Sequence, residues 1–203
     1  MRKTAEEAAL TRAALLEAAL FVFAEQGLAS ARLADVAQRA GLTRGALYYH
    51  FADKSALYAA VMEHSWATVT EPVWDLLSSG EPPEERLRAF LTTWLHRLRH
   101  DARFRALLTL TLDSSYDAAA LPAGLPEGRA AKASGLADWQ LRLEALCDEH
   151  AAAAPGAPAA PASAAANLLA WLCGTALLAA TDPALLPPDD AEGVAPVLRG
   201  LLS

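Results

Sequence analysis

Fourteen residues near the N-terminus, Leu42 to Ser55 (LTRGALYYHFADKS), concentrate side chains that recognise nucleic acid. They include an arginine, a glycine, two tyrosines, a histidine and a lysine, interleaved with apolar residues. Arginine can bind the O6 and N7 atoms of guanine with two hydrogen bonds, and hydroxyl and ammonium groups bind backbone phosphates. A glycine among them lets the backbone approach a partner closely. These residue types, on so short an element, indicate a helix that lies in the major groove of DNA.

A helical wheel drawn with about 100° per residue divides this stretch into two sides. The polar side carries Arg44, Gly45, Tyr48 and Tyr49. The apolar side carries Leu47 and Phe51, which we expect to pack inward. His50 falls on the inner side of the wheel but near the expected end of the helix, so a core position and an outward position both remain open. Lys54 begins the next helix, where its charge and the local N–H groups can meet phosphate.

The elements that position this stretch are two short helices joined by a tight turn. Leu33, Val36, Ala37 and Ala40 recur at the spacing of one helix face. Gly41 supplies the left-handed residue that ends this helix, and Thr43 is a good N-cap for the next one. A longer first helix, ended by Gly27, comes before them. The sequence therefore predicts a helix-turn-helix.

The whole chain is predicted to be all-α. Alanine, the best helix former, supplies much of its 54% hydrophobic content, and no stretch alternates with a convincing period of two. A fourth helix, capped by Asp53, should kink or break at Pro72. Later helices are expected at roughly 83–100, 102–113, 129–153, 164–181 and 190–202, with a proline-containing link over 151–166.

The net charge of −7 is distributed unevenly. Residues 1–55 hold seven Lys+Arg against six Asp+Glu, whereas residues 56–203 hold ten against eighteen, so only the first part could meet phosphates without strong repulsion. The apolar run 168–180 is shorter than the ~20 residues that a bilayer span requires. With two cysteines and no signal peptide, the sequence favours a cytoplasmic protein without a membrane partner.

The N-terminal pattern resembles a known family. Arg12, Leu15, Leu16, Ala18, Ala19, Phe23, Gly27 and the stretch 33–57 (LADVAQRAGLTRGALYYHFADKSAL) resemble the N-terminal domain of the TetR family of bacterial transcriptional regulators. Within this family, the branch that represses multidrug efflux pumps is the most similar. The resemblance implies a three-helix DNA-binding domain, placed here at 1–53, and an all-α ligand-binding and dimerisation domain, placed at 54–203. It also implies a homodimer on double-stranded operator DNA.

Carried over residue by residue, the resemblance implies two groups of DNA contacts. Thr43, Arg44 and Gly45 would meet bases or the adjacent backbone, and Tyr48, Tyr49, His50 and Lys54 would bind phosphates. The chain departs from the family just before Leu33, where Ala31 and Arg32 replace the usual threonine or serine. Arg32 could replace the lost hydroxyl–phosphate contact by a charged one, and Ser30 is then the alternative cap of the second helix.

Two further sets of residues are assigned to the C-terminal part. Candidate ligand-binding residues are Met62, Trp66, Phe90, Trp94, Phe104 and Trp139, with ordinary core packing as the alternative for each. Candidate dimer-interface residues are Leu168, Leu169, Trp171, Leu172, Val194, Val197, Leu198 and Leu201. A pocket lined by these residues binds a ligand mainly by burying its apolar surface, so we expect a small hydrophobic effector.

No catalytic, cofactor or metal site is predicted. His96 and His100 stand four residues apart on one helix, but arginines flank them and no neighbouring Cys or acid completes a metal-binding set. Nucleophile, phosphate-binding and dinucleotide motifs are absent from the sequence. The sequence therefore predicts a repressor released from a near-palindromic operator by its effector. The alternatives are an activator, a ligand-independent regulator, or a small-molecule enzyme or carrier.

Overall fold

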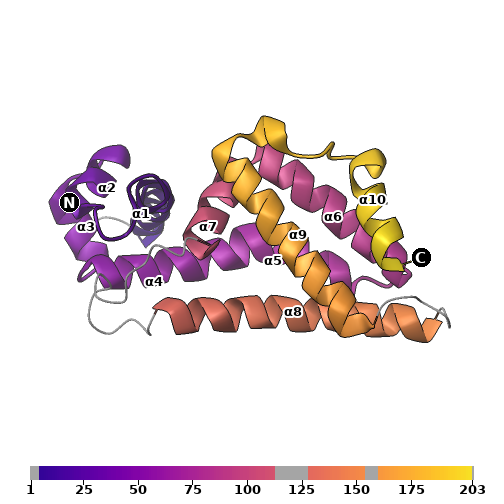
Figure 1. Cartoon of the computed structure of the whole chain (residues 1–203). Helices are drawn as coiled ribbons and strands as arrows, with labels where there is room; N and C mark the ends of the chain where they lie inside the picture. The colour runs from indigo at the N-terminus through magenta and orange to yellow at the C-terminus, as the bar shows by residue number, and fades with distance from the viewer. Residues whose placement is uncertain (1–4, 113–127, 154–159, 203) are drawn as a thin grey trace.

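The computed structural model describes residues 5–112, 128–153 and 160–202. The described residues form helices and connecting turns without a strand, which confirms the all-α prediction. Three helices, α1 (Ala5–Gln26), α2 (Leu33–Arg39) and α3 (Arg44–His50), gather at the N-terminal end of the molecule in Figure 1. The remaining helices form a second, larger group beside them.

Local sequence signals account for the turns of the N-terminal group. Gly27 and Gly41 have φ angles of 74° and 66°, a left-handed conformation that only glycine adopts without strain. After Gly41, the backbone N–H of Leu42 donates to the carbonyl of Ala37 at 2.9 Å, which closes the end of α2. The Thr43 hydroxyl then accepts a hydrogen bond from the N–H of Ala46 at 3.2 Å, which confirms the predicted cap of α3.

A long helical rod connects the two groups. It begins with α4 (Lys54–Ser65), whose first turn is capped by the Asp53 carboxylate, a hydrogen-bond acceptor for the N–H of Ala56 at 2.8 Å. A π-helical segment (Trp66–Thr70), α5 (Glu71–Trp74) and a 3₁₀ turn (Asp75–Ser78) continue it. The break predicted at Pro72 does not occur, because helical backbone continues on both sides of it. The proline, which cannot donate a backbone hydrogen bond, instead stands in the first turn of α5, directly after the π-helical segment.

The larger group contains α6 (Pro83–His100), α7 (Ala102–Leu112), α8 (Gly128–Ala153), α9 (Pro161–Thr181) and α10 (Ala191–Leu202), with a 3₁₀ turn (Pro183–Leu185) after α9. In Figure 1, α8 runs along one edge, α9 crosses it, and α10 lies against α6. The first helix of the N-terminal group, α1, packs on both α4 and α7. Through α1, the N-terminal group of helices therefore packs on both the helical rod and α7.

The helix boundaries follow the sequence closely except around α9. This helix begins at Pro161 rather than near residue 164, because a proline in the first turn gives up only an N–H that has no intrahelical partner. The predicted link over 151–166 is correspondingly shorter, and its residues 154–159 lie outside the described part. With 21 residues and a mean hydropathy of 1.5 over its most apolar window, α9 has the length and composition of a membrane-spanning helix. One side of it packs against α6, α7 and α8.

Candidate nucleic-acid interface and effector region

The exposed face of α3 carries the polar residues that the helical wheel predicted. Tyr48 and Tyr49 are 50% and 80% exposed, and Arg44 and Gly45 are also on the surface. On the opposite face Leu47 is fully buried in the hydrophobic core. The apolar face anchors the helix and turns the polar face outward.

The side chains on this face have unused hydrogen-bonding groups. Among the described residues, Arg44 has no hydrogen-bond or ion-pair partner, and the hydroxyl groups of Tyr48 and Tyr49 have none either. Two tyrosine hydroxyls and a guanidinium at the surface without hydrogen-bond partners are typical of a binding face.

Gly45 leaves space on the same face. A Cβ atom built at this position would meet nothing closer than the Thr43 Oγ1 atom at 3.8 Å. Gly45 has no left-handed φ angle either, so the fold itself does not require glycine here. A glycine that internal packing does not demand, between Arg44 and Tyr48, permits close approach of an external partner to the backbone.

The start of α2 shows which of Arg32 and Ser30 stands at the N-cap of this helix. This helix begins at Leu33, and Arg32 occupies its N-cap position with extended backbone angles (φ −108°, ψ 140°). No side chain caps it, so the alternative of a Ser30 cap is wrong. Arg32 is exposed and has no ion-pair partner in the described part of the chain, which leaves its charge available beside α3.

His50 lies between the two positions left open by the sequence. It is half-buried at the last residue of α3. Its ring contacts the edge of Tyr49, with ring centres 5.0 Å apart, and lies 6.3 Å from the ring of Phe51. The histidine therefore connects the exposed tyrosine to the buried end of the helix.

Lys54 makes contacts that differ from its expected role. Its ammonium group donates hydrogen bonds to the carbonyl oxygens of Leu28, Ala29 and Ala31, at 2.7, 3.0 and 3.1 Å. These three bonds use all the donors of the ammonium group. They tie the start of α4 to the turn that joins α1 to α2, and the phosphate contact predicted for Lys54 would have to compete with them.

The aromatic residues expected around a ligand form a continuous cluster. Phe90, Trp94 and Phe104 are fully buried and Trp139 is 2% exposed, while Met62 and Trp66 are half-buried. Neighbouring ring centres in this group lie 5.2–6.0 Å apart, as in the Trp94–Phe104 and Trp66–Trp139 pairs. Within the described residues these rings mainly pack on one another.

Trp74, which is not among the six predicted ligand-binding residues, lies between this cluster and a pocket. Its ring centre lies 5.0 Å from that of Phe90 and 5.1 Å from that of Trp139. A pocket of about 630 Å³ opens beside it. The pocket is lined by Glu71, Trp74, Asp75, Leu77, Ser78, Arg86, Arg142, Ala145, Leu146 and Glu149. None of the six predicted ligand-binding residues lines this pocket.

Charged groups surround this pocket. Arg86 is 7% exposed; it donates to the carbonyl of Leu77 at 2.9 Å and forms an ion pair with Glu149. Arg142 bridges Glu71 and Asp138 at 3.0 Å each. Although burial alone would lower it, the hydrogen bonds and charges of these two carboxylates raise the pKa of Arg142 above its ordinary value. The lining of the pocket therefore combines apolar residues such as Trp74 and Leu77 with paired charged residues.

The residues predicted for a dimer interface divide into two groups. Leu168, Leu172, Val194 and Leu198 are buried within the single chain, at most 4% exposed, so their assignment to an interface between copies is wrong. Leu169, Trp171 and Val197 are half-buried, and the side chain of Leu201 lies outside the described residues. The buried four hold α9 and α10 against the rest of the fold.

The exposed side of α9 is apolar as well. Leu177 and Leu178 are 68% and 39% exposed, and the small residues Ala166, Ala170 and Gly174 share this side. Leu141 of the adjoining α8 is 65% exposed. A surface of small residues and leucines along two packed helices is typical of a helix–helix interface. Helical periodicity alone had not distinguished this side of α9 from its buried side.

Comparison with known proteins matches the N-terminal helices to a family. The family of bacterial regulatory proteins, tetR family, matches residues 15–61, which include α2, α3 and most of α4. TtgW, an uncharacterised HTH-type transcriptional regulator of Pseudomonas putida, is 49% identical over 97 residues, which cover 39% of this chain and 72% of TtgW. The chain belongs to the TetR family.

Two other TetR-family relatives extend the comparison. AcrR, an HTH-type transcriptional regulator of Shigella flexneri, is 46% identical over 70 residues, which cover 34% of this chain and 33% of AcrR. SmeT, the repressor of a Stenotrophomonas maltophilia multidrug efflux pump, has been solved in complex with triclosan. That structure has a TM-score of 0.73 and 26% identity, and it covers 96% of this chain and 92% of SmeT.

The sequence likeness is concentrated in the DNA-binding part. For several curated relatives, AcrR among them, the match spans only about a third to a half of the relative's length. The fold likeness to SmeT extends over nearly the whole chain. The relatives are transcriptional regulators, not enzymes, which agrees with the prediction that this TetR-family chain is not an enzyme.

Proposed function

We propose that this TetR-family chain is a transcriptional repressor that binds a near-palindromic operator as a homodimer and is released by a small hydrophobic effector. The observation that carries the proposal is the exposed face of α3, where Arg44, Tyr48 and Tyr49 have no hydrogen-bond partners among the described residues and Gly45 leaves the backbone accessible. In this proposal Thr43, Arg44 and Gly45 face the bases. Tyr48, Tyr49, His50 and Arg32 then meet the phosphates.

The homodimer places two copies of α3 on one side of the DNA. A repressor with a two-fold axis binds two half-sites about one helical turn apart, or slightly more. The exposed side of α9, with Leu141 of α8, supplies the surface for pairing with a second copy. Four helices from two chains would then cover the apolar side chains that a single chain leaves in water. The domains meet in this proposal at the boundary between residues 53 and 54.

The effector acts through the rod that begins with α4. The pocket beside Trp74 lies on the α5 continuation of this rod, and Lys54 at its other end is tied to the turn between α1 and α2. A ligand that favours one position of the rod would shift the position of α3, so that the two copies no longer match both half-sites. The triclosan complex of SmeT supports a small hydrophobic effector. Because charged residues also line the pocket, we expect the effector to carry a polar or ionisable group as well.

The repressor role is favoured over the alternatives by the roles of the relatives. SmeT is a repressor of a multidrug efflux pump, and a Brucella suis relative is also named a repressor. An activator or a ligand-independent regulator would use the same α3 face. We place the protein in the cytoplasm, where the free thiols of Cys147 and Cys173 remain reduced.

The experiment that tests the proposal is selection of bound fragments from the source genome with the purified protein. We expect enrichment of a near-palindromic site in one or a few promoters. A panel of hydrophobic compounds, screened by tryptophan fluorescence, should then identify a ligand that releases this DNA over the concentration range in which it changes the fluorescence. Random DNA bound as tightly as every selected fragment would refute the proposal. DNA released only after chemical conversion of the ligand would indicate an enzyme.

A further inference from the structure

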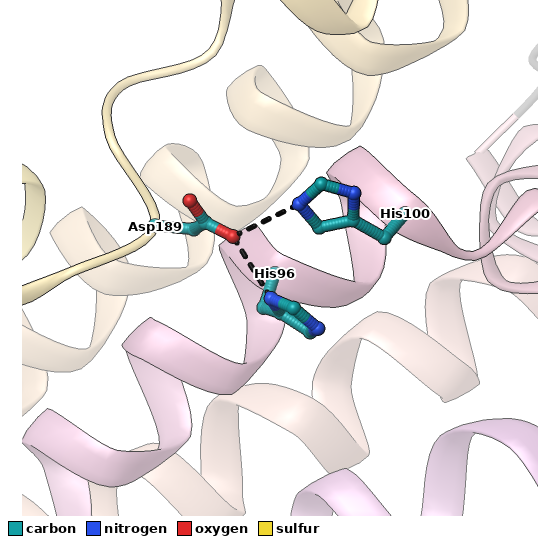
Figure 2. Close-up of side chains that lie close together, drawn as sticks. All are labelled: His96, His100 and Asp189. Atoms are coloured by element: carbon teal, nitrogen blue, oxygen red, sulfur yellow. Dashed lines mark hydrogen bonds and ion pairs between the residues drawn. The ribbon is translucent and has the colours of Figure 1, made fainter.

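Three potential metal ligands meet at the end of α6. His96 and His100 lie on successive turns of α6, and Asp189 comes from the connector between α9 and α10 (Figure 2). The Nδ1 atom of His96 lies 2.9 Å from Oδ2 of Asp189, and Nε2 of His100 lies 3.4 Å from the same oxygen. The three ligand atoms all lie within 4.8 Å of one another. No acid near the two histidines in the sequence completes a metal-binding set, but Asp189, 89 residues beyond His100, supplies a carboxylate.

The connector that carries Asp189 is fixed to α6 by Arg99. The Nη2 atom of Arg99 donates to the carbonyl oxygens of Leu186 and Pro187, at 3.1 and 2.8 Å. Its Nε atom lies 3.7 Å from Oδ1 of Asp189, the carboxylate oxygen that does not face the histidines. Two consecutive prolines, Pro187 and Pro188, further restrict the backbone before Asp189. Asp189, the third potential ligand, is therefore held in position without a bound ion.

The chemistry of the three side chains suits a metal ion. A carboxylate beside two imidazoles is a ligand set that zinc and similar divalent metals prefer. The three ligand atoms come from two separate segments of the chain and lie within 4.8 Å of one another.

We propose that His96, His100 and Asp189 form a binding site for a divalent transition-metal ion, with Zn²⁺ as the ion of choice. Tetrahedral coordination with metal–ligand distances of about 2.0–2.2 Å places neighbouring ligand atoms roughly 3.3–3.5 Å apart. The His100–Asp189 distance of 3.4 Å fits this value, and the His96–Asp189 distance of 2.9 Å is slightly shorter. Both imidazole side chains are more than half exposed, so small rotations complete the geometry.

The fourth coordination position has room for water. A pocket of about 360 Å³ adjoins the two histidines, and Arg97, Asp101, Ala102 and Arg103 also line it. Four-coordinate zinc with three protein ligands and one water is a recurrent arrangement. An ion held here would join α6 to the connector that leads into α10, and so stabilise the packing of α10 on α6.

The arginines near the histidines repel a metal ion less than their number suggests, because some of them are paired with other groups. Arg97 is paired with Asp101 at 2.8 Å, and Arg105 donates to the carbonyl oxygens of Leu98 and Arg99. Arg99 is the one cation that also contacts Asp189 among the described residues. Its positive charge lowers the affinity, so the site should bind zinc less tightly than a closed structural site with four protein ligands.

Zinc titration of the full-length, untagged, metal-free protein tests the proposal. Competition with a chromophoric chelator at pH 7.5 should give one Zn²⁺ per chain, and zinc should raise the melting temperature. His96→Gln and Asp189→Asn should each weaken binding at least about tenfold, the scale on which even indirect metal partners act.

Two matched controls separate a site from general changes in charge or histidine content. Asp190→Asn removes a carboxylate from the adjacent residue, and asparagine can still accept the hydrogen bonds that Asp190 receives from Glu192 and Gly193. His64→Gln removes a histidine from α4, far from the connector in sequence. Both variants should bind zinc as the wild type does. The proposal is overturned if the wild type binds no more zinc than His96→Gln, or if the control variants lose zinc to the same extent.

Discussion

Replacing Lys54 by methionine tests whether this lysine holds the DNA-binding helices together or contacts DNA. The substitution keeps an unbranched side chain and removes the ammonium group. That group donates to the carbonyl oxygens of Leu28, Ala29 and Ala31, at 2.7, 3.0 and 3.1 Å. The bonds to Leu28 and Ala31 are partly buried, and the bond to Ala29 is exposed.

The expected loss of stability follows from these contacts. A typical hydrogen bond contributes about 1 kcal/mol net, and water can replace the donor at an exposed carbonyl. Counting the two partly buried bonds gives about 2 kcal/mol for Lys54→Met. For a chain of this size, each kcal/mol shifts the melting temperature by roughly 2–4 °C. We therefore expect the melting temperature to fall by about 4–8 °C.

Urea denaturation and the salt dependence of operator binding provide the assay. If Lys54 is structural, Lys54→Met lowers the free energy of unfolding, and the slope of log K against log salt for the folded protein stays unchanged. Arg32→Met is the control, since Arg32 is exposed and has no ion-pair partner among the described residues. It should leave stability within about 0.5 kcal/mol and reduce the salt slope by about 1. Unchanged stability with a reduced slope for Lys54→Met would refute the structural role.

Three further predictions concern the cap of α3, the dimer and a buried thiol. Thr43→Ala should cost about 1 kcal/mol in urea denaturation, whereas Thr43→Ser should retain most of the stability. Leu177→Glu should convert dimers to monomers in sedimentation, whereas Leu10→Glu, at an equally exposed leucine of α1, should leave the dimer intact. Burial raises the pKa of Cys147 to about 11, so alkylation of the native protein should be slow until the pH approaches that value. Because the unfolded thiol loses its proton first, stability should fall as pH rises from about 9 to 11, and less so in Cys147→Ala.

Features set by neighbouring residues could be predicted from the sequence. Gly41 ends α2 and Thr43 caps α3 through contacts within a few residues, so the turn follows directly from local backbone chemistry. Asp53 caps α4 in the same way. The polar face of α3 is equally local, because Leu47 buries one side of a helix of known pitch and so exposes the other.

Features that join distant parts of the chain could not be predicted. Lys54 is 23–26 residues from the carbonyl groups it binds, and Asp189 is 93 residues from His96. Four of the eight residues assigned to the dimer interface, Leu168 among them, were wrongly placed there for a related reason. Both sides of α9 are apolar, so periodicity alone could not show that Leu168 faces the core while Leu177 faces outward.

The central claim is that α3 reads the bases of an operator through Arg44. Fluorescence anisotropy with the selected operator and with random DNA of equal length, for wild type and Arg44→Ala, tests it most directly. Loss of a bidentate contact to guanine should weaken operator binding by about 1–3 kcal/mol and affect random DNA much less. Equal losses on the two DNAs would contradict base recognition by Arg44.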